Sequence, residues 1–143
     1  MGELAQKIAE QYCASRKTDV NSLLHNYGGI LHSVQDFYAH SNFVEQFDGI
    51  YDPSNPAQKN VVSGITRNTR NVPLNRRHGD TSSGMNKDSS GRPNFDRART
   101  AAVEATRQNW EQMREEIRQR HAKLKADGKC CIEIEEILKW FTG

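Results

Sequence analysis

The stretch LHSVQDFYAHSNFVE, residues 31–45, places His32, Asp36 and His40 four residues apart among aromatic and aliphatic residues. In an α-helix of 3.6 residues per turn, this spacing puts all three side chains on one face. Histidine and aspartate are common metal ligands, and buried charged groups are stable only when they are paired or bind a metal. The stretch therefore predicts a helix that carries either a metal site or a buried polar network.

The helix that contains this stretch is predicted to begin after Thr18 or Asp19, either of which can cap it, and to end near Ala39. Its apolar residues occupy more than one stripe, so we expect the helix to be central and buried on two sides. These residues are Val20, Leu23, Leu24, Tyr27, Ile30, Leu31, Val34, Phe37 and Tyr38.

Apolar residues at helical spacing also predict helices over residues 3–16, 94–126 and 132–141. Residues 46–93 contain all four prolines and little periodicity, so we expect a loop-rich region with one short helix near residues 56–66. No strand is expected. The sequence thus predicts an all-α fold, a compact bundle of four to five helices around a buried central helix, with a long irregular loop.

The length of 143 residues predicts one domain over residues 1–143. The 20 Lys and Arg against 18 Asp and Glu give a net charge of +2, which is too near neutral to favour nucleic acid as a partner. No apolar run reaches the ~18 residues that a membrane span needs, and residues 1–6 do not open a signal peptide. The oligomeric state is left open.

Three cysteines, Cys13, Cys130 and Cys131, are present. An odd number argues against a closed disulfide framework, so we expect reduced thiols. Reduced thiols favour the cytoplasm without fixing the compartment. The alternative is a bond from Cys13 to one of the adjacent pair, which requires the two ends of the chain to meet.

Spacing along the helix limits how the candidate ligands can share a metal. Residues four apart are separated by ~6 Å, which suits two ligands of one ion, whereas His32 and His40 are ~12 Å apart. Either Asp36 bridges two ions, or the backbone turns near Ala39. His25 lies on the same stripe, and for it a metal ligand and a structural histidine are equally balanced. Imidazole with carboxylate favours zinc or another transition metal over magnesium.

Two further residues are weighed for chemistry. Glu45 follows the motif closely and is a candidate general base or ligand. His121 lies on the apolar face of the helix expected over residues 94–126, where we expect packing rather than metal ligation.

Residues 31–45 resemble the motif of the Het-C family, named for heterokaryon incompatibility, which also occurs near the N-terminus of a group of von Willebrand factor A domain-containing proteins. A second block, GMNKDSS at residues 84–90 and the alanine-rich residues 98–106, looks like the family's G-[IL]-N-K-D-S segment and the helix after it. His78, followed by a glycine, also fits. The two blocks cover roughly residues 20–120.

The resemblance implies a helical fold related to zinc-dependent phospholipase C and the zinc-dependent single-strand nucleases, which hydrolyse phosphodiesters with clustered zinc ions. It implies the motif residues His32, Asp36 and His40 as zinc ligands, with His78 as a further ligand from the loop. It gives Asp88 or Lys87 the task of anchoring the loop over the site, or Lys87 that of meeting a phosphate.

The chain departs from the family upstream of the motif, where members usually carry further ligands. Here about thirty residues precede His32 and they hold one histidine, His25. We therefore expect one or two ions instead of three.

The predicted function is that of a small zinc-dependent hydrolase of a small-molecule or lipid phosphoester, with a metal-bound water as nucleophile. Asp36, Glu45 and Lys87 are the candidate catalytic residues. One alternative is a non-catalytic interaction or incompatibility module with a structural metal or a buried polar site. Another is a metalloenzyme with non-phosphate chemistry, and the sequence leaves open whether the protein is an enzyme.

Overall fold

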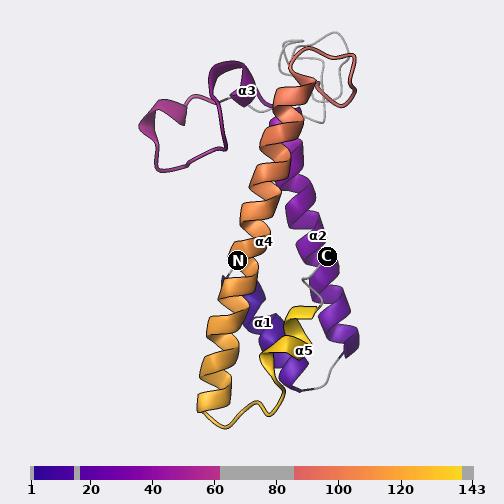
Figure 1. Cartoon of the computed structure of the whole chain (residues 1–143), viewed down its shortest axis with the longest axis vertical. Helices are drawn as coiled ribbons and strands as arrows, with labels where there is room; N and C mark the ends of the chain where they lie inside the picture. The colour runs from indigo at the N-terminus through magenta and orange to yellow at the C-terminus, as the bar shows by residue number, and fades with distance from the viewer. Residues whose placement is uncertain (1, 15–16, 62–85, 140–143) are drawn as a thin grey trace, which may run out of the picture. The chain divides into compact units, whose positions relative to one another are not determined.

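The structure is a computed structural model that describes residues 2–14, 17–61 and 86–139, and it is built from helices (Figure 1). In chain order they are α1 (Gly2–Cys13), α2 (Lys17–Ala39), α3 (Phe43–Gln46), the 3-10 helix η1 (Pro56–Gln58), α4 (Phe95–Ala126) and α5 (Ile134–Leu138). No strand forms in these ranges. The all-α prediction is confirmed.

The helices follow the apolar periodicity of the sequence closely. α1, α2, α4 and α5 lie within or near the four ranges that helical spacing predicts. Two short elements differ from the prediction. α3 has four residues and was not predicted, and the helix expected over residues 56–66 is reduced to η1 in the part of that range that is described.

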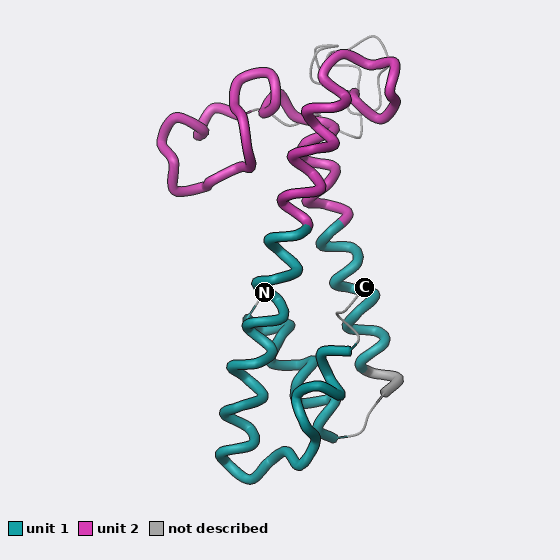
Figure 2. Tube along the Cα trace, in the orientation of Figure 1, with its two compact units in different colours: residues 1–31, 107–143 teal, residues 32–106 magenta. Residues whose placement is uncertain are grey.

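The chain divides into two compact units (Figure 2). Unit 1 comprises residues 1–31 and 107–143, and unit 2 comprises residues 32–106. Both α2 and α4 contribute residues to each unit. The single domain expected over residues 1–143 stays a prediction.

Unit 1 has a hydrophobic core to which four helices contribute. Helical spacing of three or four residues places apolar side chains of each helix on the face that meets the others. The buried members are Ala5, Ile8 and Tyr12 of α1, Val20 and Tyr27 of α2, Met113 and Ile117 of α4, and Ile137 and Leu138 of α5. This core holds α5, which is too short to be stable by itself.

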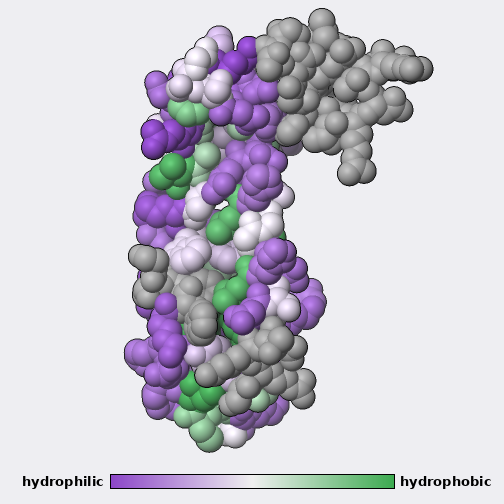
Figure 3. Space-filling model, turned by 90° about the vertical axis from the view of Figure 1, so that its right-hand side faces the viewer, coloured by the Kyte–Doolittle hydropathy of each residue, from purple (hydrophilic) through white to green (hydrophobic). Residues whose placement is uncertain are grey.

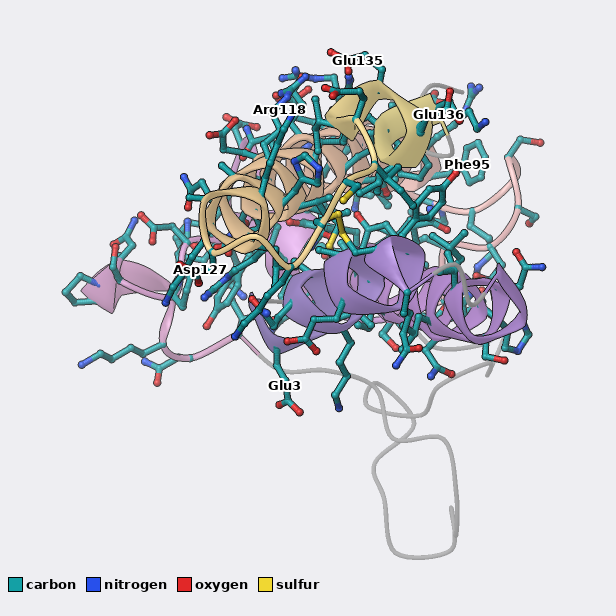
Figure 4. All side chains as sticks on the ribbon, turned by 90° about the horizontal axis from the view of Figure 1, so that it is seen from below. Glu3, Phe95, Arg118, Asp127, Glu135 and Glu136 are labelled. Carbon is teal, nitrogen blue, oxygen red and sulfur yellow. A yellow bond between two sulfur atoms is a disulfide. The ribbon has the colours of Figure 1, made fainter. Side chains whose placement is uncertain are left out.

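A disulfide joins α1 to the connection between α4 and α5 in unit 1. Cys13 bonds to Cys130 with a Cα–Cα distance of 5.1 Å, and Figure 4 draws this bond in yellow. The adjacent Cys131 is free and exposed. The expectation of reduced thiols is therefore wrong for two of the three cysteines. The alternative holds because packing of α1 against α4 brings the two ends of the chain together.

α4 ends in a glycine cap that turns the chain towards α5. Gly128 has φ +71°, its N–H donates to the Lys125 carbonyl at 3.1 Å, and the Lys129 N–H donates to the Leu124 carbonyl at 2.8 Å. These two bonds define a Schellman motif, in which glycine adopts the left-handed conformation without a Cβ clash. The cap fixes the direction in which Cys130 leaves the helix.

Unit 2 has a separate core of aromatic and alanine residues. Its buried members are Tyr38, Phe43, Val44, Ala98, Ala101 and Ala105. The ring centroid of Phe43 lies 5.5 Å from that of Tyr38 and 5.8 Å from that of Phe37. Burial raises the pKa of Tyr38, although its hydroxyl oxygen accepts a hydrogen bond from the Tyr51 N–H at 2.9 Å, which acts in the opposite direction.

α2 is less buried than its apolar content predicts. Among its described side chains, residues 20–39, only Val20, Tyr27 and Tyr38 are buried, and Ile30 is 38% exposed. The expectation of burial on two sides is wrong, because the elements that pack on α2 leave one of its sides open to solvent.

Ionisation of Tyr27 is predicted to lower the stability of unit 1 at alkaline pH. The Tyr27 hydroxyl donates to Asn109 Oδ1 at 3.0 Å, and burial raises its pKa from 10.0 to about 12. In the unfolded chain the Tyr27 phenol ionises from about pH 10, whereas in the folded protein it stays neutral up to about pH 12. The neutral phenol's contribution to the free energy of unfolding is therefore complete below about pH 10 and is lost as the pH rises towards about 12. We expect the free energy of unfolding, measured with urea, to fall less steeply between about pH 9 and about pH 11 in Tyr27→Phe than in the wild-type protein. An unchanged slope would contradict the assignment.

The chain is polar in composition, with a mean hydropathy of −0.85. On the face shown in Figure 3, hydrophilic side chains predominate and hydrophobic ones are visible only in small areas between them. Among the helices that the structure describes, none combines the length and the apolar character that crossing a membrane would require.

Candidate metal and phosphoester site

His32 and Asp36 form a pair on the exposed side of α2. Their i, i+4 spacing brings His32 Nε2 to 3.4 Å from Asp36 Oδ2. The side chains are 73% and 41% exposed, respectively. The two ligand-type groups are thus close together and open to solvent.

A cavity of about 470 Å³ lies beside this pair in unit 2. Its polar lining includes His32, Asp36, Asp88 and Arg99, and its apolar lining includes Phe95 and Val103. Ligand sites of 300–1,000 Å³ commonly combine such an apolar lining with a few polar groups. The cavity can therefore hold a small molecule whose polar end meets both the His32–Asp36 pair and Arg99.

His40 follows the last residue of α2 and is buried. Its backbone N–H still donates to the Asp36 carbonyl at 2.9 Å. α2 nevertheless ends at Ala39, where one of the two alternatives drawn from the spacing requires the backbone to turn. The ring Nε2 lies 3.1 Å from Asp88 Oδ1, and the side chain is 5% exposed. The His40 side chain thus contacts the segment that precedes α4.

Lys87 is buried and ion-paired with Glu45. Its Nζ lies 2.9 Å from Glu45 Oε1 and donates to the Ser41 carbonyl at 2.7 Å. The Lys87 side chain is fully buried, whereas that of Glu45 is 31% exposed. Glu45 is not among the residues that line the cavity.

The backbone of residues 86–92 completes this attachment. The Lys87 N–H donates to the Ala39 carbonyl at 3.1 Å, and Arg92 Nε donates to the Asn86 carbonyl at 2.8 Å. The Asp88 N–H donates to Asn86 Oδ1 at 3.0 Å. Lys87, through its N–H, and Asp88, through its contact with His40, thus attach the segment to the end of α2. The roles expected from the resemblance, anchoring of a loop over the site and contact of Lys87 with a phosphate, stay predictions.

The predicted ligands are not assembled into one set. In the described ranges, the sole group of three or more histidine, cysteine or acidic side chains with close ligand atoms is Cys13, His121 and Cys130 in unit 1. His32 pairs with Asp36, whereas His40 pairs with Asp88. His25 is exposed and belongs to unit 1, and His78 lies outside the described residues.

Two of the cavity residues were not predicted from the sequence. Arg99 and Thr106 line the cavity from α4, and the Thr106 hydroxyl accepts a hydrogen bond from Gln35 Nε2 at 3.2 Å. The spacing of residues 95, 99, 102 and 106 at three or four could have revealed this stripe. Its small and polar residues, however, resemble an ordinary solvated helix face.

In comparisons with protein-family models, curated proteins and solved structures, nothing matched this chain.

Proposed function

We propose that the cavity beside His32 and Asp36 is the site of a metal-dependent phosphoester hydrolase of the Het-C and phospholipase C kind. The observation that supports this proposal is the joint presence of the His32–Asp36 pair and Arg99 in the lining of one cavity. The pair supplies metal ligands, and the guanidinium supplies a partner for a phosphate.

The donor groups fit a transition metal. One imidazole nitrogen and one carboxylate are ligands that zinc, iron and manganese accept, and both groups are accessible to solvent. Asp88 adds a second carboxylate to the lining while its Oδ1 contacts His40. When bound, zinc would act as a Lewis acid towards a phosphoryl oxygen.

The rest of the lining suits a phosphoester with an apolar portion. Arg99 in the lining carries a planar guanidinium, a group that can bind phosphate oxygens in a bidentate manner. Ala98, Ala102 and Val103 lie in the same lining, and Val103 is 62% exposed. A small-molecule or lipid phosphoester can therefore place its anionic group at Arg99 and its apolar group along α4.

The second candidate function is that of a non-catalytic module with a buried polar site. Two ion pairs favour it, His40–Asp88 and Lys87–Glu45, because they attach the segment that holds Lys87 and Asp88 to the end of α2 and to α3. In this case the motif stabilises unit 2 and carries no chemistry.

Hydrolysis of bis(p-nitrophenyl) phosphate separates the two candidates. We expect zinc- or manganese-dependent turnover that falls at least about tenfold in Asp36→Asn, since even residues behind a catalytic metal's ligands typically contribute 10–100-fold. Asp48→Asn is the matched control, because Asp48 is 97% exposed and does not line this cavity. Absence of turnover with any of the metals in the wild-type protein would reject the hydrolase and leave the module.

A further inference from the structure

Unit 1 contains a second cluster of metal-ligand side chains, distinct from the cavity in unit 2. One ligand atom from each of Cys13, His121 and Cys130 lies within 4.8 Å of the others. Cys130 and His121 are 5% and 4% exposed, respectively. Three such groups from α1, α4 and the α4–α5 connection meet at one place, although 117 residues separate the two cysteines.

His121 has a backbone hydrogen-bond partner of the kind that metal-ligating histidines usually have. His121 Nε2 lies 2.6 Å from the Ile132 carbonyl oxygen, to which a protonated Nε2 donates. In the neutral ring the lone pair then resides on Nδ1. Zinc-bound histidines characteristically donate their other ring N–H to a backbone carbonyl or carboxylate, which fixes the tautomer.

We propose that reduction of the Cys13–Cys130 disulfide converts this cluster into a binding site for zinc or a similar thiophilic ion. Two molecules of a small thiol reductant, such as glutathione, supply two electrons and two protons. They break the Sγ–Sγ bond and leave two protein thiols and one oxidised disulfide of the reductant. Zinc then displaces the two thiol protons and binds two thiolates and the His121 imidazole.

The chemistry of the donors selects this class of ion. Two thiolates and one imidazole are a soft donor set that favours zinc over calcium or magnesium. Three protein ligands leave the fourth tetrahedral position to solvent. The same atoms cannot bind the ion while the sulfurs are bonded to each other, so the oxidation state of the pair controls the site.

The neighbourhood of the pair gives access to both the reductant and the ion. A cavity of about 600 Å³ is lined by Cys13 together with Glu10, Arg120 and Asp127. Two Zn–S bonds of ~2.3 Å at the tetrahedral angle require the sulfurs to lie ~3.8 Å apart. Cys130 lies outside any helix, so a side-chain rotation with a small backbone adjustment can provide this separation.

Zinc titration of the oxidised and the reduced protein tests the proposal. The full chain carrying Asp36→Asn is used, so that the unit 2 site does not contribute, and the reductant is removed under argon before calorimetry. We expect one zinc per chain in the reduced protein and none in the oxidised protein. Cobalt should give a thiolate charge-transfer band in the reduced protein alone, which reports sulfur ligation directly.

Three variants assign the ligands. Cys131→Ser is the matched control and should keep the stoichiometry, because the exposed Cys131 is not in the cluster. Cys130→Ser and His121→Gln should each weaken binding at least tenfold. For Cys130→Ser the cobalt band of any folded fraction should also shrink, which distinguishes a lost ligand from misfolding. Equal zinc binding by the reduced and oxidised proteins, or full binding with an unchanged cobalt band by Cys130→Ser, would overturn the proposal.

Discussion

Removal of the Cys13–Cys130 disulfide is expected to lower the free energy of unfolding by about 4 kcal/mol. The bond spans 117 residues, and in the chain-entropy description closing a loop of this length restricts the unfolded chain strongly. Since small domains are stable by only about 5–15 kcal/mol, this is a large share of the total. Urea unfolding of the wild-type protein and of Cys13→Ala/Cys130→Ala, in buffer with a chelator, measures the difference.

The free thiol provides the control for this measurement. Cys131 is exposed and unbonded, so Cys131→Ser should change the free energy of unfolding by less than about 0.5 kcal/mol. If the double alanine variant were as stable as the wild-type protein to within about 1 kcal/mol, the bond would not be a main constraint on the fold.

Loss of the Glu45 carboxylate is expected to destabilise unit 2 by about 3 kcal/mol. Glu45→Ala removes the counter-charge of the fully buried Lys87 ammonium, which then retains its hydrogen bond to the Ser41 carbonyl at 2.7 Å. A buried charge without its counter-charge is far more costly than the loss of an exposed ion pair. The figure is at the low end of the usual range because Glu45 is 31% exposed and partly hydrated.

A double-mutant cycle separates this coupling from general damage. Lys87→Met removes the buried charge, so Glu45→Ala/Lys87→Met should be destabilised by less than the sum of the single changes, as residues in direct contact usually are. Asp48→Ala breaks the exposed pair with Arg97 and should change stability by less than about 0.5 kcal/mol. Strict additivity in the cycle would show that the ion pair does not stabilise the protein.

The sequence predicts the long helices because their apolar residues recur at 3.6-residue spacing over many turns. This holds for α2 and α4, and α4 ends at Ala126, as its predicted range does. α3 escapes prediction because four residues contain barely one turn and so have no periodicity. Burial of α2 is overestimated because apolar content does not tell how many neighbours a helix has.

The site is predictable where it depends on local spacing and not where it depends on long-range contacts. The His32–Asp36 pair follows from i, i+4 geometry on one helix. The partners of His40 and Lys87 come from segments more than 40 residues away, so only the tertiary structure brings them together. The same reason explains Cys13 and Cys130, whose pairing the sequence leaves as one of several possibilities.

The central claim is that the cavity in unit 2 binds a transition metal at His32 and Asp36. Anomalous X-ray scattering at the zinc edge tests it most directly, on crystals of the disulfide-bonded protein soaked in zinc, so that Cys13 and Cys130 do not compete. We predict a peak within about 2.3 Å of a ring nitrogen of His32 and a carboxylate oxygen of Asp36, and its loss in Asp36→Asn. A wild-type map without zinc at this pair, although the cavity is open to solvent, would contradict the claim.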